Sequence, residues 1–295
     1  MSVVEKGQAG RVTGRKPLDS EIDVYGLTHQ GKVRPTNQDH FLLCSLRKHM
    51  DVHLTSLPDT RNLTTDSDRI AFLAMVADGV GSTTLGEVAA RRAVEDIGAY
   101  IAHSMNCYYT ADPNDDRVFT QALEQAATRC HTALAQQAAA DPDGRRMATT
   151  LTLFLGVWPR VYVMQVGDSR YYLMRAGRLT QISRDQTMAQ ELLDAGVISR
   201  SDASHSQWAN VLSSAIGGPQ TNPVVTAIDN SWDSIHLLCS DGLTKHVSDQ
   251  QIQERLRSMT SARQICEQLL QDALDDGGTD NITIIVGRAV LRTDS

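Results

Sequence analysis

The chain lacks the cysteine pattern of a disulfide framework or of a cysteine-based zinc site. Its cysteines are five in number, and no two of them form a C-x-x-C pair. Disulfide-stapled domains use even sets of cysteines, and structural zinc sites use closely spaced pairs. We therefore expect a reducing compartment, the cytoplasm. The five are Cys44, Cys107, Cys130, Cys239 and Cys266.

Long apolar runs are also missing. The uncharged stretch from Met147 to Pro159 ends at Arg160, well short of the roughly 20 apolar residues that a membrane helix needs. The N-terminus carries basic residues but neither the apolar segment nor the small-residue cleavage site of a secretory signal. We predict no membrane span and no membrane partner. Residues 1–21 and 291–295 are predicted to be flexible tails.

An excess of basic charge is absent as well. Lys and Arg number 28 against 35 Asp and Glu, which gives a net charge of -7. A nucleic-acid-binding surface would have to be basic in a chain that repels phosphate overall, so nucleic acid is excluded as a partner. With 295 residues, 41% of them hydrophobic, the chain can bury a substantial core. We expect one domain over residues 22–290, in a monomer.

Short apolar, β-branched runs predict strands, and stretches between them have helical spacing. Residues 116–140 place apolar side chains every three or four positions. Ser248 and Ser261 are each followed by Gln three positions later, as at helix starts. Because the strands come in adjacent groups, we predict an α+β fold with antiparallel sheets rather than a doubly wound parallel sheet. The predicted strands are Ile70–Ala77, Leu151–Val157, Val161–Val166, Ser234–Cys239 and Ile282–Val286.

One segment, residues 47–69, is polar, turn-rich and long for a connection inside a compact domain. It can be a mobile surface insertion, or a loop that docks a partner or regulates the protein. The sequence leaves both interpretations open.

Aspartates recur where predicted strands begin or end. Asp78, Asp168 and Asp241 follow apolar runs, while Asp39 and Asp280 precede them. One such aspartate is usually a turn former or a helix cap, but five together, three of them beside glycine, suggest a common site. Converging carboxylates repel one another and need a cation. With oxygen ligands and no His or Cys at ligand spacing, that cation is Mg²⁺ or Mn²⁺ rather than zinc.

Two neighbours of these aspartates have a chemical use of their own. Gly79 lets the backbone turn sharply and present a carbonyl oxygen to a metal. Arg34, five residues before Asp39, could place its guanidinium over a phosphate. The alternative for Arg34 is an ordinary surface arginine before Pro35.

Five sequence blocks occur in the order and spacing of a known family. Each is weakly specific, but together they resemble the metal-dependent Ser/Thr protein phosphatases of the protein phosphatase 2C (PPM) type, in their bacterial form. The resemblance covers about residues 22–290, and residues 183–220 are similar to the family's flap beside the active site. The blocks are GKVRPTNQD (31–39), VADGVGSTTLGEVAA (76–90), MATTLTLFLGV with VYVMQVGDSRYYL (147–173), LLCSDGLTKHV (237–247) and GGTDNITIIV (277–286).

The resemblance implies a four-layer α-β-β-α sandwich of two antiparallel sheets flanked by helices, with two Mg²⁺ or Mn²⁺ ions at one end. In this resemblance Asp78 bridges the two ions and the Gly79 carbonyl completes one site. Asp241 and Asp280 bind the other ion. Asp168, together with Asp241, corresponds to the ligands of a third ion in bacterial relatives.

The resemblance also implies a reaction. Arg34 would grip the substrate phosphate, while Gln38, Asp39 and Asn281 would support the metal ligands, the first two through water. Arg34 and Asp39 thus join the metal-binding Asp78 and Asp241 as catalytic residues. The implied activity is hydrolysis of phosphoserine and phosphothreonine in proteins by a metal-activated water, opposing a bacterial Ser/Thr kinase.

Rival chemistries lack their signatures. No cysteine has Arg six positions later, which excludes the C-x5-R cysteine phosphatases, and no D-x-D motif follows a predicted strand. Neither G-x-G-x-x-G nor G-x-x-x-x-G-K-[ST] is present, which argues against a nucleotide-binding domain.

Two departures from the family keep one alternative open, a weak or silent member that acts as a regulatory binding module. The first is the DGVGS turn, in which Ser82 replaces a usual glycine and Val80 stands where eukaryotic members have a histidine, so the group that protonates the leaving oxygen is unassigned. The second is the 47–69 segment, which lengthens a connection. Ala148 also replaces a glycine, a change between small residues that we expect to matter little.

Overall fold

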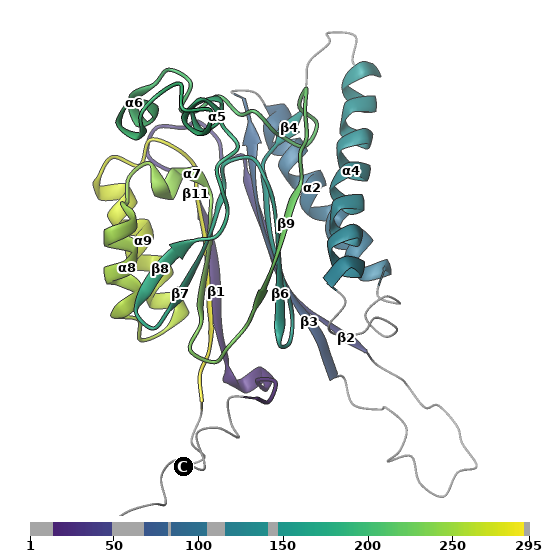
Figure 1. The fold of residues 1–295 in the computed structure, drawn as a ribbon, viewed down its shortest axis with the longest axis vertical. Coiled ribbons are helices and arrows are strands. Elements are labelled where there is room, and N and C mark those ends of the chain that lie inside the picture. Colours follow the sequence, from purple (N-terminus) through teal and green to yellow (C-terminus); the bar gives the residue numbers. More distant parts are fainter. Residues whose placement is uncertain (1–13, 49–67, 82–83, 105–115, 141–146, 292–295) are drawn as a thin grey trace, which may run out of the picture.

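A computed structural model describes residues 14–48, 68–81, 84–104, 116–140 and 147–291. Two antiparallel sheets lie face to face, with helices on both outer sides (Figure 1). The four-layer α+β sandwich predicted for the chain is confirmed. Figure 1 also shows α5 (Met188–Asp194) and α6 (Arg200–His205) at one end of the sandwich, and the short helix η1 (Asp19–Glu21) at the other.

Each sheet has its own set of covering helices. Sheet A has the strand order β1-β11-β10-β7-β8, and sheet B the order β2-β3-β5-β6-β9, with β4 paired to the end of β3. The strands of sheet A are β1 (Ile22–His29), β11 (Ile282–Ala289), β10 (Ile235–Cys239), β7 (Arg170–Arg175) and β8 (Arg178–Gln181). Those of sheet B are β2 (Asp39–Lys48), β3 (Asp68–Val80), β5 (Leu151–Val157), β6 (Arg160–Val166) and β9 (Val224–Asp229), and β4 is Ala148–Thr149. The helices on sheet A are α7 (Asp241–Thr244), α8 (Asp249–Arg257) and α9 (Ala262–Asp275), and those on sheet B are α2 (Thr84–His103) and α4 (Asp116–Ala140).

The helices form where the sequence pattern predicts them. In α4 the apolar positions of the pattern, Phe119, Leu123, Cys130 and Leu134, are all buried against sheet B. The side chains of Ser248 and Ser261 accept hydrogen bonds from the backbone N–H of Gln251 and Gln264 and so cap α8 and α9. Four of the five predicted strands lie within β3, β5, β6 and β11, and the fifth, Ser234–Cys239, begins one residue before β10.

A separate cluster of buried side chains lies between the two sheets. It includes Val76 and Phe154 from sheet B and Tyr171, Leu238 and Ile285 from sheet A. Strands that carry buried residues on both faces read as nearly continuous apolar runs, which is why these segments were recognisable in the sequence.

The predicted N-terminal tail is too long. Residues 14–21 are packed at the end of the sandwich where η1 lies: Glu21 is buried and receives a bidentate ion pair from Arg15, with distances of 2.5 and 2.7 Å. Trp232 donates its indole N–H to the Arg15 carbonyl and stacks under the same guanidinium. The contact with Trp232 joins residues that are 217 positions apart in the sequence. Residues 1–13 and 292–295 lie outside the described part.

The connection predicted over residues 47–69 is shorter in the structure, because β2 continues to Lys48 and β3 begins at Asp68. Arg47 pairs with Arg69 and Lys48 with Asp68 across the two strands. Residues 49–67 lie outside the described residues.

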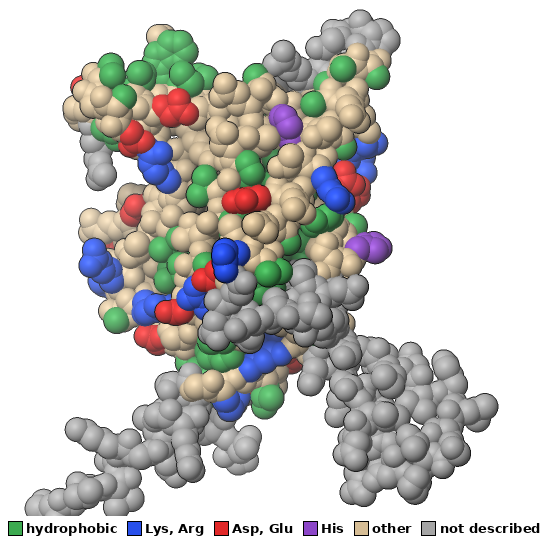
Figure 2. All heavy atoms as spheres, turned by 45° about the vertical axis from the view of Figure 1, so that its right-hand side comes forward, with side chains coloured by type: hydrophobic (Ala, Val, Ile, Leu, Met, Phe, Trp, Pro, Cys, Tyr) green, Lys and Arg blue, Asp and Glu red, His purple; other side chains and the backbone are tan. Residues whose placement is uncertain are grey.

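Among the helices of the described ranges, none combines the length and the apolarity of a membrane-spanning segment. On the face drawn in Figure 2, the basic and acidic side chains of the described residues are intermixed.

Candidate metal and phosphate site

The strand-end aspartates come together at one end of the sandwich, which we call the carboxylate end. Asp39 at the start of β2 is the cross-strand partner of Asp78 near the end of β3. Asp241 follows β10 and Asp280 precedes β11. These two strands are neighbours in sheet A. Asp168 lies in the turn between β6 and β7. Both sheets therefore contribute carboxylates to the same end.

An open cavity of about 1000 Å³ lies at this end. Asp78, Asp168, Asp241 and Asp280 line it, whereas Asp39 is not among the lining residues and is buried, with 3% of its surface exposed. The remaining residues predicted for the site also line the cavity, and they are Arg34, Gln38, Gly79 and Asn281.

The backbone of Asp78 is fixed from β4 and β5. Its N–H donates to the Thr150 hydroxyl at 3.1 Å, and its carbonyl accepts from the Thr150 N–H and the Thr149 hydroxyl, both at 2.9 Å. Gly79 then packs directly on α2: a Cβ at this position would lie 2.4 Å from the Gly86 carbonyl. Only glycine permits this approach, which places the end of β3 against the start of α2.

Asp39 is held behind the cavity floor. Its Oδ2 accepts hydrogen bonds from the hydroxyls of Ser240 and Thr283, both at 2.7 Å, while its Oδ1 has no partner. Burial, together with the negative charges of Asp241 and Asp280, raises the pKa of Asp39 to about 7, against the effect of the two hydroxyl donors.

The pKa values of Asp78 and Asp168 are raised for the same reasons as that of Asp39. Burial, followed by the charges of Asp39 and Asp241, raises the pKa of Asp78 well above its usual value. Burial and the charge of Asp241 raise the pKa of Asp168 to about 8. These three carboxyls, two of which line the cavity, therefore make this end of the molecule favourable to a cation.

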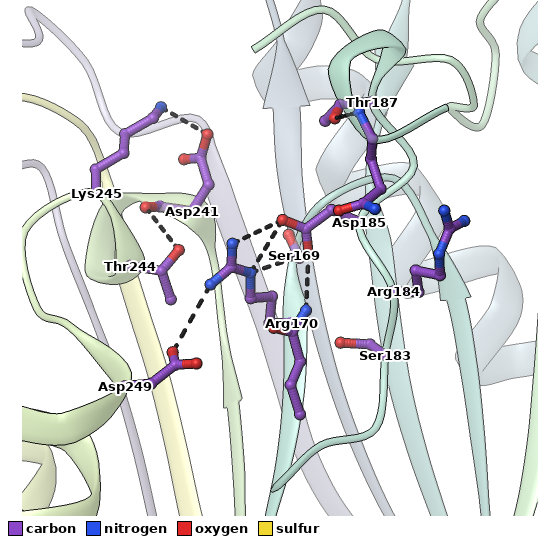
Figure 3. A network of polar contacts seen from close by, with 12 residues as sticks. Ser169, Arg170, Ser183, Arg184, Asp185, Thr187, Asp241, Thr244, Lys245 and Asp249 are labelled. Atoms are coloured by element: carbon purple, nitrogen blue, oxygen red, sulfur yellow. Dashed lines mark hydrogen bonds and ion pairs between the residues drawn. The ribbon is translucent and has the colours of Figure 1, made fainter. Parts of the chain in front are cut away.

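Two cations of the chain itself reach the other two carboxylates. The Nζ of Lys245 lies 2.6 Å from the Oδ2 of Asp241 and 2.6 Å from the Oδ2 of Asp280, and Figure 3 shows its ion pair with Asp241. The guanidinium of Arg34 contacts both oxygens of Asp280, at 2.7 and 2.8 Å. Although burial works in the opposite direction, Arg34 and Lys245 lower the pKa of Asp280, and Asp241 and Asp280 raise that of Lys245.

Asn281 ties the Arg34 loop to the Asp280 turn. Its Nδ2 donates to the carbonyls of Gln30 and Thr36, at 2.8 and 2.9 Å, and its Oδ1 accepts from the Gln38 N–H at 2.9 Å. The Gln38 carbonyl in turn accepts from the Gly79 N–H at 3.3 Å. Asn281 therefore orients the segment that carries Arg34 relative to the carboxylates.

The Asp168 turn is tied to the start of the flap by residues that the sequence prediction missed. Arg170, two residues after Asp168, makes a bidentate ion pair with Asp185, with the shortest contact at 2.7 Å (Figure 3). Gln186 accepts from the Gly167 N–H through its side chain and donates its own N–H to the Gly167 carbonyl. Lys245 was also missed, although its position four residues after Asp241, one helical turn away, is a signal that the sequence contains.

The donor set fits a hard divalent cation. The ligand candidates are carboxylate oxygens and the Gly79 carbonyl, which suit Mg²⁺ or Mn²⁺. The Oδ1 atoms of Asp39 and Asp241 are buried and have no hydrogen-bond partner, so this end of the molecule has acceptor capacity that the protein does not satisfy. In the described part of the chain, however, no three His, Cys, Asp or Glu side chains converge as a ready-made metal cage. Asp241 and Asp280 are turned toward Lys245 instead.

The flap forms one wall of the cavity. Thr187 caps α5, and Met188, Glu191, Val211 and Pro219 line the opening from this side. From the other side, Val80 lines it with 37% of its surface exposed. Ser82, one of the predicted departures, lies outside the described residues.

Comparisons with known proteins agree with the resemblance of the five sequence blocks. Residues 59–280 match the family model of protein phosphatase 2C. The chain is 34% identical to the serine/threonine protein phosphatase PstP of Mycobacterium tuberculosis over 220 residues, 75% of this chain and 41% of that protein. It is 30% identical to the serine/threonine phosphatase stp of Listeria welshimeri over 216 residues, 72% of this chain and 83% of that protein.

A solved structure of the catalytic domain of PstP in complex with two manganese ions is similar with a TM-score of 0.67 and 29% sequence identity. The match covers 92% of this chain and 99% of that one. The chain thus spans about two fifths of the length of full PstP and almost all of the solved domain.

Proposed function

The chain belongs to the protein phosphatase 2C family, and from this membership we propose that it is a metal-dependent protein phosphatase that hydrolyses phosphoserine and phosphothreonine. The observation that carries the proposal is the joint lining of one cavity by four carboxylates and Arg34. Carboxylates that lack compensation suit a divalent cation, and a guanidinium beside them suits a phosphate.

Asp78, the Gly79 carbonyl, Asp168, Asp241 and Asp280 would hold Mn²⁺ or Mg²⁺. When bound, these ions supply Lewis acidity, which activates water near neutral pH and neutralises charge on the phosphoryl oxygens. Two ions are proposed, with a third at Asp168 and Asp241. The PstP structure with two manganese ions supports the choice of manganese.

The other residues of the site bind the phosphate, orient the loop that carries Arg34 and exclude water from the cavity. Arg34 has 43% of its side chain exposed, and in the cavity it can donate two parallel hydrogen bonds to a phosphate. Asn281 keeps the Arg34 loop in register with the carboxylates. Asp39 lies buried behind Asp78, and its Oδ1, which has no partner in the protein, can accept a hydrogen bond from water. The flap side chains Met188 and Val211 cover the opposite wall.

Phosphorylated proteins are the proposed substrates, and a Ser/Thr kinase the proposed opposing enzyme. We further propose that the protein is a cytoplasmic monomer and acts in signalling. The names of the relatives support the substrate class.

The proposal is tested by release of p-nitrophenol from p-nitrophenyl phosphate, and of phosphate from a phosphothreonine peptide, with and without Mn²⁺. We expect both reactions to require the ion and to be abolished by Asp241→Asn. Absence of turnover by the wild type in either Mn²⁺ or Mg²⁺ would contradict the proposal.

A second candidate, a weak or silent member that acts as a regulatory binding module, is favoured by one observation. Lys245 occupies the space between Asp241 and Asp280, and a cation of the protein can substitute for a metal in neutralising carboxylates. Such a protein would bind a phosphopeptide through Arg34 without hydrolysing it. Peptide binding with no phosphate release in millimolar Mn²⁺ would favour this candidate.

A further inference from the structure

We propose that Lys245 is a built-in cation that competes with the divalent ion for Asp241 and Asp280 and so sets the metal affinity of this part of the site. The inference rests on the proposed function in one respect, because the ion concerned is the proposed cofactor. Its direct consequence is that removal of the Lys245 charge makes the protein bind Mn²⁺ more tightly.

The geometry of the ammonium group leads to this inference. The Nζ of Lys245 is 2.6 Å from one oxygen of each carboxylate, so it bridges the two side chains (Figure 3 shows the pair with Asp241). The three side chains are 28%, 18% and 14% exposed, so water screens the contacts only in part. A divalent ion that bound these same oxygens would have to displace the ammonium group or bind beside it.

The backbone of Lys245 is fixed close to the carboxylates. It follows α7 directly, and its N–H donates to the Asp241 carbonyl at 2.8 Å. The helix is itself pressed against the Asp280 turn, since a Cβ on Gly242 would lie 1.9 Å from the Asn281 carbonyl. An ammonium group displaced by a metal would therefore remain in the cavity, where repulsion between the two cations weakens metal binding.

The charges around the cavity are not evenly compensated. Asp241 and Asp280 have Lys245, and Asp280 also has Arg34. Among the described residues, no Lys or Arg lies within ion-pair distance of Asp39, Asp78 or Asp168. We expect ions to bind in unequal steps, with the weaker step at the carboxylates that Lys245 holds.

The test compares Mn²⁺ binding to the metal-stripped full chain by isothermal titration calorimetry. Lys245→Met removes the charge and keeps the apolar stem, Lys245→Arg keeps the charge, and Lys32→Met removes a charge from the exposed loop after β1. We expect Lys245→Met to lower the Kd of the weakest step at least about tenfold, and the other two variants to stay within about threefold of wild type. Unchanged or weaker binding by Lys245→Met would overturn the proposal.

A measurement on the wild type covers the case in which Lys245→Met does not fold. Acetylation of Lys245 by acetic anhydride, followed by mass spectrometry, reports how free the amine is, and Lys32 in the same digest is the reference. Because the ion would displace the ammonium group from the two carboxylates, the amine would become more accessible. We therefore expect Mn²⁺ to accelerate acetylation of Lys245 at least about threefold relative to Lys32. An equal or slower rate in saturating Mn²⁺ would refute the competition.

These readouts do not depend on turnover. If Lys245→Met gains Mn²⁺ affinity but no variant hydrolyses a phosphate ester, the inference stands and the proposed function fails. If hydrolysis is Mn²⁺-dependent but Lys245→Met leaves the Kd unchanged, the proposed function stands and the inference fails.

Discussion

The two ends of the sandwich differ in how completely their acidic side chains are paired with basic ones. At the end where η1 lies, which we call the base, acids are matched with arginines: Glu21 with Arg15 at 2.5 Å, and Asp19 with Arg69 at 2.6 Å. At the carboxylate end, Asp39 has no arginine or lysine within ion-pair distance among the described residues and one oxygen without any partner.

This difference distinguishes structural from functional charge. Hydrogen bonds from Arg47 lower the pKa of Asp19, so that carboxylate is stabilised by the fold. Burial raises the pKa of Asp39 to about 7, so that carboxylate costs stability when it is ionised. A protein retains such a cost where a bound cation can offset it.

The largest expected effect is at the carboxylate end, with Asp78→Asn. Loss of a proposed bridging ligand should lower kcat on p-nitrophenyl phosphate by about a thousandfold or more. The metal-free variant should nevertheless be more stable than metal-free wild type at pH 8, by about 1 kcal/mol, because an amide does not suffer the burial that raises the pKa of Asp78. Thermal unfolding without metal checks this, and a destabilised variant would remove the contrast between the ends.

Arg69→Ala tests the base. Arg69 has 7% of its side chain exposed and donates to Asp19 and to the Pro17 carbonyl, both at 2.6 Å. Its loss should lower the free energy of unfolding by about 2–3 kcal/mol, with kcat per folded molecule unchanged. Arg91→Ala, on the exposed face of α2, is the control and should change stability by less than about 0.5 kcal/mol. A drop in kcat for Arg69→Ala would show that the two ends are not independent.

Arg34→Ala examines a cation at the carboxylate end that is more exposed than Lys245. We expect KM for a phosphopeptide to rise about tenfold, because the variant lacks the two parallel donors. The Kd for Mn²⁺ should change by less than about threefold, since water already screens a side chain that is 43% exposed. Loss of bound metal from this variant would show that Arg34 supports the ions rather than the substrate.

The smallest effect concerns His236, which lines a second cavity, at the base of the sandwich, and whose Nδ1 is 2.7 Å from the Tyr171 hydroxyl. Burial lowers its pKa to about 3. The unfolded chain therefore takes up a proton first, and stability that is complete above about pH 6.5 is lost as the pH falls toward 3. Over guanidinium unfolding from pH 6.5 to 4.5, the free energy of unfolding of the wild type should fall by about 1 kcal/mol per pH unit relative to that of His236→Gln, in which the other titrating groups are the same. Equal slopes in both proteins would refute this assignment.

The fold was predictable where a pattern repeats along the chain. The three- to four-residue spacing in α4 and the Ser–Gln pairs that cap α8 and α9 are local signals, and the structure bears them out. The packing of residues 14–21 was not predictable, because it depends on partners such as Arg69 and Trp232 that are distant in sequence.

The carboxylates of the site could be predicted from the sequence, but the contacts that hold its loops together could not. Asp78 and Asp241 stand at recognisable strand ends, and the resemblance assigned their roles. The contacts of Arg170 with Asp185, and of Lys245 with Asp280, join loops that only the folded chain brings together. No spacing rule in a single sequence reports such contacts.

Strand β3 connects the two ends. It runs from Asp68 to Val80, so Arg69 at the base and Asp78 in the cavity belong to one continuous element in the middle of sheet B. Because β3 pairs with both β2 and β5, it cannot open without breaking the ladders on either side. Its central amides should accordingly exchange with solvent deuterium only through global unfolding, which gives the molecule a single cooperative unit in which neither end can melt alone.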